Sequence, residues 1–175
     1  RAFPSAPPIR NPSATAIHAE PALRNQNRNR TDAAILIVNS TQRHVFLTGK
    51  AGTGKTTFLH RLAATTHKRY LVLAPTGIAA LNARGVTLHS QFQLPFGAFV
   101  PERHLPADLG EYGAYIDQHT LASRHAMNAL RRAVLREVDL LVIDEVSMLR
   151  ADLLDAVDQR MRSAKGSARS FGGAQ

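Results

Sequence analysis

The chain of 175 residues contains no cysteine, which excludes disulfide bonds and cysteine-rich zinc sites. No apolar run approaches the roughly 20 residues of a membrane-spanning helix, so no membrane partner is expected. The 8 histidines are scattered, and no two stand at metal-ligand spacing on one expected helix, so they are interpreted as surface or core residues. With 44% hydrophobic residues, the composition is that of one globular domain with a buried core.

Acidic side chains are also scarce. Lys and Arg together number 22 against 13 acidic residues, which gives a net charge of +9 and a sequence pI near 11.0. Such an excess favours a polyanionic partner, of which nucleic acid is the commonest. A basic surface that serves only solubility, or a basic tail unrelated to function, explains the same excess equally well.

The first 30 residues differ in composition from the rest. They hold five of the nine prolines, five arginines and a single acid, Glu20, without hydrophobic periodicity. This composition predicts a disordered basic tail over residues 1–30, followed by a folded domain over 31–175. An Arg-rich, acid-poor start is also typical of an organelle transit peptide. Because the first residue is Arg and not Met, an upstream portion is expected to be missing.

The most informative feature is a complete phosphate-binding loop. Residues 49–56 read Gly-Lys-Ala-Gly-Thr-Gly-Lys-Thr, with a β-prone run at 44–48 and a helix-compatible run at 57–64. Glycines allow consecutive N–H groups to face phosphates, and the helix N-terminus adds its positive dipole end. Lys55 is expected to reach the β- and γ-phosphates, and Thr56 to place its hydroxyl on Mg²⁺. The alternative is a Gly-rich turn with an accidental Lys-Thr. The expected ATP-binding set is Gly49, Lys50, Ala51, Gly52, Thr53, Gly54, Lys55, Thr56 and Thr57.

An acidic pair follows a second apolar run. Residues 140–143 are continuously apolar, as is typical of a parallel strand buried on both faces. Asp144 and Glu145 stand at its C-terminal end, where ligands bind in open α/β sheets. Asp144 is expected to hold hydrated magnesium and Glu145 to polarise an attacking water, so Lys55, Asp144 and Glu145 form the candidate catalytic set for ATP hydrolysis. The alternative is a strand that runs into a solvated acidic turn.

The remaining pattern alternates strands and helices. A strand is predicted at 70–74, and a short helix near 78 with Thr76 as its cap. Residues 92–118 are predicted to be irregular and 166–175 to be a loop. Helices are predicted at 33–38, 121–137 and 150–162, the last with Leu153, Leu154, Val157 and Met161 on one face. This alternation predicts an α/β fold of the P-loop NTPase class, with a RecA-like parallel sheet flanked by helices.

The stretch between the loop and the acidic pair carries a family resemblance. Residues 74–90, Ala-Pro-Thr-Gly-Ile-Ala-Ala-Leu-Asn-Ala-Arg-Gly-Val-Thr-Leu-His-Ser, closely resemble the second motif region of PIF-type helicases, relatives of RecD in helicase superfamily one. The likeness continues through 92–97, Phe-Gln-Leu-Pro-Phe-Gly, and through 144–155. Residues 171–175 resemble the lead-in to the family's next motif. The resemblance covers roughly residues 31–175.

The resemblance implies an enzyme that hydrolyses ATP between two RecA-like domains and walks 5′ to 3′ along single-stranded DNA, in repair, recombination and genome maintenance. It also implies an intracellular location, in the cytoplasm or nucleoid of a bacterium or the nucleus or mitochondrion of a eukaryote. By this likeness, Thr76 and Gly77 meet a DNA phosphate, and Thr87, His89 and Ser90 line the same strand. Phe92 and Phe96 offer faces for base stacking, or pack under the irregular segment instead. The residues around 76 also fit an ordinary helix start.

The sequence departs from the family pattern in two respects. The second RecA-like domain, with its arginine finger, is absent from residues 1–175, so this chain is expected to bind ATP and DNA without unwinding. Asp32 occupies the position, seventeen residues ahead of Gly49, where the family has an adenine-reading glutamine. Gln26 and Gln42 are out of register. Asp32 is interpreted either as a poorer adenine contact or as the cap of the following helix, beside Thr31. Rival functions are an AAA-type loader, a small-molecule kinase and a nucleotide- and DNA-binding module without turnover.

Overall fold

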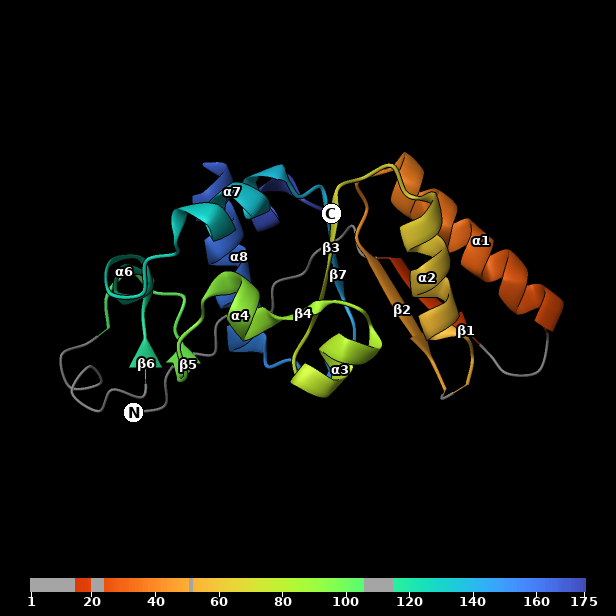
Figure 1. Cartoon of the computed structure of the whole chain (residues 1–175), viewed down its shortest axis with the longest axis horizontal. Helices are drawn as coiled ribbons and strands as arrows, with labels where there is room; N and C mark the ends of the chain where they lie inside the picture. The colour runs from red at the N-terminus through yellow and green to blue at the C-terminus, as the bar shows by residue number, and fades with distance from the viewer. Residues whose placement is uncertain (1–14, 20–23, 51, 106–114) are drawn as a thin grey trace, which may run out of the picture. The chain divides into compact units, whose positions relative to one another are not determined.

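The computed structural model describes residues 15–19, 24–50, 52–105 and 115–175 (Figure 1). The chain divides into two compact units, unit 1 (Arg1–Thr66) and unit 2 (His67–Gln175). Among the described residues, none of the helices combines the length and apolar character needed to cross a lipid bilayer.

Unit 1 contains two parallel strands and two helices. Strand β1 (Thr15–Ala19) pairs with β2 (Val45–Gly49) over the full length of both strands, and helix α1 (Arg24–Ser40) connects them. Helix α2 (Lys55–Thr65) follows the phosphate loop. Each helix buries residues four positions apart, which lie on one helical face. These residues are Ala34 and Val38 of α1 and Phe58 and Leu62 of α2.

The predicted strand before the loop and the helix after it are confirmed in unit 1. The predicted helix at 33–38 is part of α1, which begins earlier, at Arg24. For residues 1–14 and 20–23, the predicted disordered tail lies outside the described residues. In the rest of the tail, Thr15–Ala19 form β1, whose backbone groups find partners on β2. Composition could not reveal this pairing, because it depends on a strand 30 residues away in register.

Unit 2 is built on a parallel sheet of strand order β4–β3–β7. Its strands are β3 (Tyr70–Ala74), β4 (Val86–Thr87) and β7 (Leu140–Ile143). Each strand is followed at its C-terminal end by a short helix: α3 (Gly77–Asn82), α4 (Leu88–Phe92) and the 3₁₀ turn η1 (Val146–Met148). The other edge of β7 bonds to the last residue, because Gln175 N donates to Asp139 O (2.9 Å) and Leu141 N donates to Gln175 O (2.9 Å).

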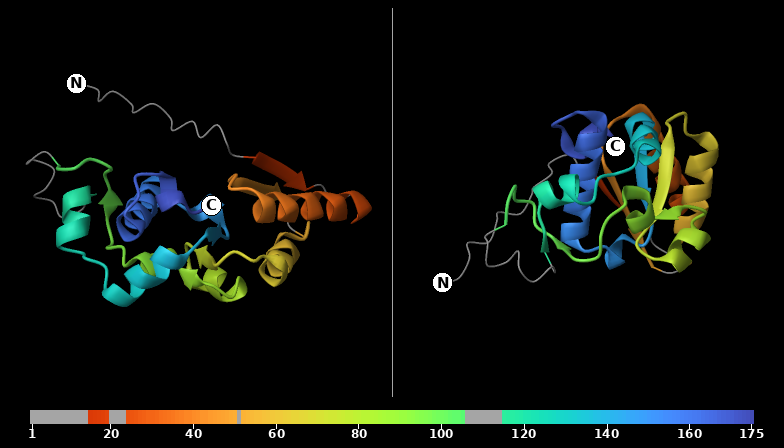
Figure 2. Two further views of the ribbon diagram at one scale, coloured as in Figure 1. Left: turned by 90° about the horizontal axis from the view of Figure 1, so that it is seen from above. Right: turned by 60° about the vertical axis from the view of Figure 1, so that its left-hand side comes forward.

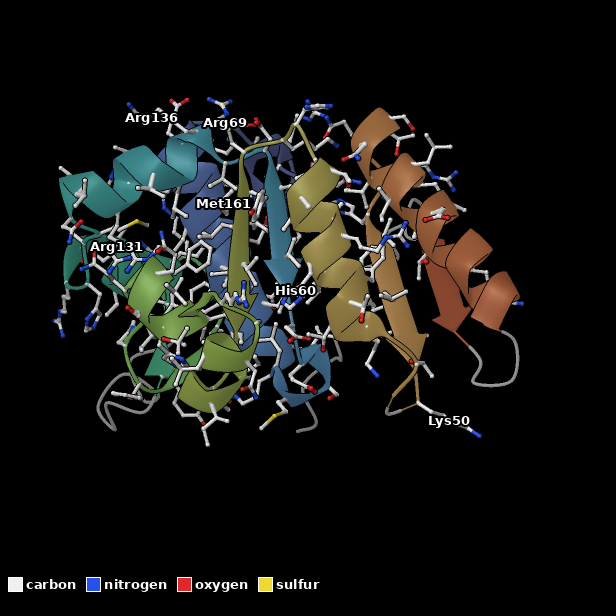
Figure 3. All side chains as sticks on the ribbon, turned by 45° about the vertical axis from the view of Figure 1, so that its right-hand side comes forward. Lys50, His60, Arg69, Arg131, Arg136 and Met161 are labelled. Carbon is white, nitrogen blue, oxygen red and sulfur yellow. The ribbon has the colours of Figure 1, made fainter. Side chains whose placement is uncertain are left out.

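Helix α8 (Ala151–Lys165) forms the centre of unit 2. Figures 1 and 2 show it between the sheet on one side and α6 (Gln118–Ser123), β5 (Ala98–Phe99) and β6 (Tyr115–Ile116) on the other. Helix α7 (Ala129–Glu137) packs on α8, and the 3₁₀ turn η2 (Ser170–Gly173) covers its C-terminal end. The fully buried side chains of this core include Leu73, Leu88, Phe92, Leu121, Leu135, Val157 and Met161. Met161, labelled in Figure 3, lies between α8 and the sheet.

Most elements predicted for unit 2 are confirmed: the strands at 70–74 and 140–143, the Thr76-capped helix, and the helix near 150–162. The single helix predicted at 121–137 is wrong. It is divided into α6 and α7, because the Asn128 side chain accepts the N–H of Arg131 (2.8 Å) and caps a new helix there. Between α4 and α6, the described part of the segment predicted to be irregular contains the two-residue strands β5 and β6, and 106–114 lie outside the described residues. The predicted terminal loop contains η2.

Candidate nucleotide and nucleic-acid sites

The phosphate loop of unit 1 has the backbone geometry that its glycines predict. Gly52 (φ 75°) and Gly54 (φ 92°) have positive φ values, which side-chain-bearing residues rarely adopt. Gly54 leads directly into α2, and no acidic residue occupies the first turn of that helix. The positive end of the helix dipole therefore faces the loop without a competing carboxylate, as an anion site requires. Ala51 lies outside the described residues.

Two lysines of the loop differ in their placement. Lys55 Nζ donates to the carbonyl oxygens of Gly49 (2.7 Å) and Lys50 (3.1 Å), so its ammonium group is held over the loop. Lys50 is exposed, and Figure 3 shows its side chain pointing away from the loop. Thr53 Oγ1 donates to Lys50 O (2.8 Å) and braces the turn, while Thr56 and Thr57 are exposed on the first turn of α2. The loop therefore offers one positioned ammonium group and exposed hydroxyls.

The acidic pair of unit 2 stands at the C-terminal end of β7. Asp144 N donates to Leu73 O (2.9 Å), and Asp144 Oδ1 accepts the N–H of Glu145 (3.0 Å). No described residue hydrogen-bonds to Asp144 Oδ2, so one carboxylate oxygen is available to a hard cation such as Mg²⁺. Glu145 is exposed and adopts a left-handed backbone conformation (φ 51°, ψ 42°). This conformation costs a non-glycine residue roughly 1–2 kcal/mol, and such strain concentrates at functional sites.

The candidate DNA-contacting hydroxyls act as helix caps. Thr76 Oγ1 accepts the N–H of Ala79 and Thr87 Oγ1 accepts the N–H of Ser90, both at 3.2 Å. As hydrogen-bond acceptors, both hydroxyl oxygens therefore serve an ordinary helix start, which was the alternative interpretation of this motif. Each hydroxyl still has a proton to donate to a phosphate. Gly77 is exposed, and an added Cβ would meet nothing within 4 Å there, so its backbone is open to a ligand.

The register of the sheet brings this motif next to the acidic pair. Ala74 pairs with Thr87 on one side, and Leu73 pairs with Ile143 on the other. Asp144 directly follows β7 and its N–H donates to Leu73 O, so Asp144 and Thr87 lie on opposite sides of the C-terminal end of β3, just before the Thr76 cap. Figure 3 shows α3 and the segment after β7 at the same end of the sheet. One edge of unit 2 thus carries both sets of candidate residues.

The two aromatic candidates have different environments. Phe92 has no exposed surface and packs in the core, so the prediction that it stacks on a DNA base is wrong, and its alternative, packing, is correct. The cause is that Phe92 ends α4 on the same face as buried Leu88, four positions earlier. Phe96 is 91% exposed and stacks on the ring of His89, with centroids 5.6 Å apart and planes inclined by 23°. Of these two residues, Phe96 is therefore the one with a ring face open to a ligand.

The position expected to read adenine has a different partner. Asp32 lies within α1, so the prediction that it caps a helix is wrong: that helix begins eight residues earlier, at Arg24. The Asp32 carboxylate pairs with the guanidinium of Arg61 on α2, which also donates to Thr31 Oγ1 (3.4 Å). The pair ties α1 to α2 within unit 1.

Sequence reasoning missed the contacts made by three polar side chains of α8 and its N-cap. Arg150 donates to Gly97 O (3.2 Å) and pairs with Asp152, whose Oδ2 accepts the N–H of Phe99 (3.0 Å). The hydrogen bond from Arg150 lowers the pKa of Asp152 against the opposing effect of burial. Arg160 is buried and donates to three backbone carbonyls. No local pattern signals the contacts to the backbone, because each backbone partner is at least 35 residues away in sequence.

The chain is similar to known proteins in sequence and in fold. The family model described as AAA domain matches residues 25–175. The ATP-dependent DNA helicase PIF7 of Trypanosoma brucei brucei is 40% identical over 147 residues, which cover 79% of this chain and 13% of that protein. Pif1 from Bacteroides sp in complex with ADP-AlF4 is 39% identical with a TM-score of 0.68, over 83% of this chain and 30% of that one. Bacteroides Pif1 bound to single-stranded DNA is 38% identical with a TM-score of 0.65, over 89% of this chain and 31% of that one. The chain thus spans less than a third of each of these proteins.

Proposed function

Because the chain belongs to the AAA-domain family of Pif1-type helicases, we propose that it is the first RecA-like motor domain of a helicase. The whole enzyme couples ATP hydrolysis to 5′-to-3′ movement along single-stranded DNA and acts in DNA maintenance, in the nucleoid, nucleus or mitochondrion. The observation that carries this proposal is the shared sheet edge of unit 2. There, the C-terminal end of β3 is flanked by Asp144, a candidate for hydrolysis, and by Thr87, a candidate for DNA contact.

The nucleotide is assigned to the phosphate loop. The N-terminus of α2 and the Lys55 ammonium group supply positive charge for the phosphates. In unit 1, the exposed Thr56 hydroxyl is a hard oxygen ligand of the kind that Mg²⁺ prefers. In unit 2, the available carboxylate oxygen of Asp144 is a ligand of the same kind. Mg²⁺ would supply charge stabilisation for phosphoryl transfer, and Glu145 would orient and polarise the attacking water. The Bacteroides relative bound to ADP-AlF4 supports nucleotide use by this fold.

We assign single-stranded DNA to the same edge of unit 2, to its hydrogen-bond donors and not to its carboxylates. The Thr76 and Thr87 hydroxyls and the open Gly77 backbone can donate to phosphates, beside His89 and Ser90. The net charge of +9 adds long-range attraction to a polyanion. The Bacteroides relative bound to single-stranded DNA supports this partner. A small-molecule kinase would share the phosphate loop but would have no use for this motif.

Titration calorimetry with ATP and magnesium tests the nucleotide assignment. We expect Lys55→Ala to weaken binding at least tenfold, because it removes a charge-assisted contact to the phosphates. Lys50→Ala is the matched control: it removes the same charge from the same loop, but its side chain points away. Equal losses in the two variants would contradict the role of Lys55.

Turnover tests the motor assignment. We expect residues 1–175 alone to hydrolyse ATP slowly, because an arginine supplied in trans is worth about 10³–10⁵ in rate. A longer version with a second RecA-like domain should be stimulated by single-stranded DNA, and Glu145→Gln should abolish the stimulated rate. If single-stranded DNA did not stimulate ATP hydrolysis by that longer version, a different P-loop protein or a binding module without turnover would be favoured.

A further inference from the structure

The loop that carries Phe96 is fixed on both sides, although its central ring is exposed. Leu94 and Phe99 are buried in the core of unit 2, and Phe96 projects between them. On its N-terminal side, Gln93 ends α4 in a left-handed conformation (φ 48°), and its carbonyl accepts from Arg160 (3.1 Å). The backbone therefore cannot withdraw the ring by a small rotation without breaking core contacts.

The C-terminal side of the loop is held by the start of α8. Arg150 donates to Gly97 O (3.2 Å), and Asp152 Oδ2 accepts the N–H of Phe99 (3.0 Å). Arg150 and Asp152 are also bound to each other, with Arg150 Nε 2.9 Å from Asp152 Oδ1. The pair thus bonds the backbone on both sides of Ala98, directly after the exposed ring.

An exposed phenylalanine on a loop whose backbone is hydrogen-bonded on both sides is a candidate contact for a ligand. Its ring stacks on His89, one of the proposed DNA-contacting residues, and the rest of its surface is open. A base that stacks on such a ring gains affinity only if the ring is already in place, since ordering it on binding would consume part of the gain.

We propose that Arg150 and Asp152 are positioning residues that hold the Phe96–His89 ring pair as a preformed stacking platform for one base of single-stranded DNA. This inference rests on the proposed function and adds to it two residues that touch neither nucleotide nor DNA. They act through the backbone of Gly97 and Phe99, and through it on the position of the ring.

The structure offers a matched control on the same helix. Asp158 also pairs with an arginine, Arg162 (2.8 Å), and also accepts a backbone N–H, that of Phe171. Asp152→Ala and Asp158→Ala each remove one negative charge and leave one N–H and one arginine without their carboxylate. Only Asp152 touches the loop of Phe96. Electrostatics alone predicts slightly tighter DNA binding for both variants.

The experiment measures the affinity of the full chain for oligothymidine that contains one 2-aminopurine, a base whose fluorescence falls when it stacks. We expect Phe96→Ala to weaken binding about tenfold and to abolish the fluorescence change. Asp152→Ala should weaken binding several-fold and reduce the fluorescence change, against the electrostatic trend, while Asp158→Ala should bind as tightly as the unmodified chain or more tightly. A far-ultraviolet circular dichroism spectrum that is unchanged in Asp152→Ala reports that unit 2 is still folded.

A double-mutant cycle separates positioning from direct contact. If Arg150 acts through the ring, Arg150→Met should weaken binding more than Arg162→Met does, and this difference should vanish when Phe96 is already alanine. Additive effects of Arg150→Met and Phe96→Ala would instead mean that Arg150 contacts a phosphate and would overturn the inference. The inference would also be overturned if Asp152→Ala bound single-stranded DNA as tightly as Asp158→Ala. If the unmodified chain bound no single-stranded DNA, both the proposed function and the stacking platform would be contradicted. If the unmodified chain and Phe96→Ala bound single-stranded DNA equally well, only the stacking platform would be contradicted.

Discussion

Replacement of the buried Arg160 by methionine should strongly destabilise unit 2. The guanidinium of Arg160, on a residue that is 4% exposed, donates to Leu121 O (3.2 Å), Gln93 O (3.1 Å) and His125 O. These bonds connect α8 to the end of α4, to Leu121 within α6 and to His125 just after α6. No described acidic side chain pairs with it, so its stability contribution depends on these carbonyls.

Two opposing contributions set the magnitude. Hydrogen bonds from a charged donor are worth about 1.5–3 kcal/mol each, so three bonds contribute about 5–9 kcal/mol. Against this, burial and, less strongly, the charge of Arg132 lower the pKa of Arg160 to about 10. This lowering corresponds to a penalty of about 3 kcal/mol for holding the charge inside. Arg160→Met removes the bonds and the penalty together and keeps most of the apolar packing, so the expected net loss is about 2–6 kcal/mol.

Urea unfolding followed by far-ultraviolet circular dichroism measures this loss. Arg124→Met is the matched control, because Arg124 is exposed at the end of α6, and it should change the free energy of unfolding by less than about 0.5 kcal/mol. Arg160→Lys should be destabilised as well, since a single ammonium group lacks the planar fork that reaches three carbonyls. A loss below about 1 kcal/mol in Arg160→Met, or full stability in Arg160→Lys, would refute this reasoning.

Two further predictions concern acid sensitivity and base selection. Burial alone would raise the pKa of Asp117, but the N–H groups of Thr120 (2.6 Å) and Leu105 (2.9 Å) outweigh it and lower the pKa. The ionised carboxylate therefore stabilises the fold at neutral pH, and this contribution is lost as the pH falls through the lowered pKa; Asp117→Asn should flatten the dependence of urea stability on pH below about pH 5. Asp32 can accept but not donate a hydrogen bond, so ATP should be favoured over GTP by less than about tenfold in competition binding. The variant Asp32→Gln should change the stability little, because the ion pair between Asp32 and Arg61 is exposed. Strong discrimination that Asp32→Gln leaves unchanged would show that the base is read elsewhere.

The parts of the fold that the sequence predicts are those set by short-range chemistry. The phosphate loop needs positive φ at Gly52 and Gly54, and both residues are glycines. The Thr76 cap needs only its own hydroxyl and an N–H three residues later. The strand at 140–143 needs only a continuous apolar run between polar residues. In each case the determinant lies within a few residues, so a local pattern is sufficient.

The site residues that the sequence missed are set by long-range contacts. Asp32 follows Thr31 and resembles a helix cap, yet α1 already began at Arg24 and its carboxylate turns to Arg61 on another helix. Arg160 is charged and would be expected at the surface, although it lies three residues after Val157 and one before Met161, both buried. The helical period predicts its burial, and its charge predicts the opposite. Backbone carbonyls of distant loops resolve the conflict, and no sequence pattern marks them in advance.

Phe92 and Phe96 show why the identity of a residue alone could not assign the stacking site. Both phenylalanines belong to the stretch 92–97 that resembles PIF-type helicases, and they are four positions apart. On a continuous helix, residues four positions apart would lie on the same face. The helix ends between them, because Gln93 adopts a left-handed conformation and its carbonyl is held by Arg160. One ring therefore completes the core, and the other is exposed to solvent on a loop whose Gly97 and Phe99 backbone groups bond to Arg150 and Asp152. The base-stacking role that we propose for Phe96 thus depends on three polar side chains that are more than 50 residues further along the chain.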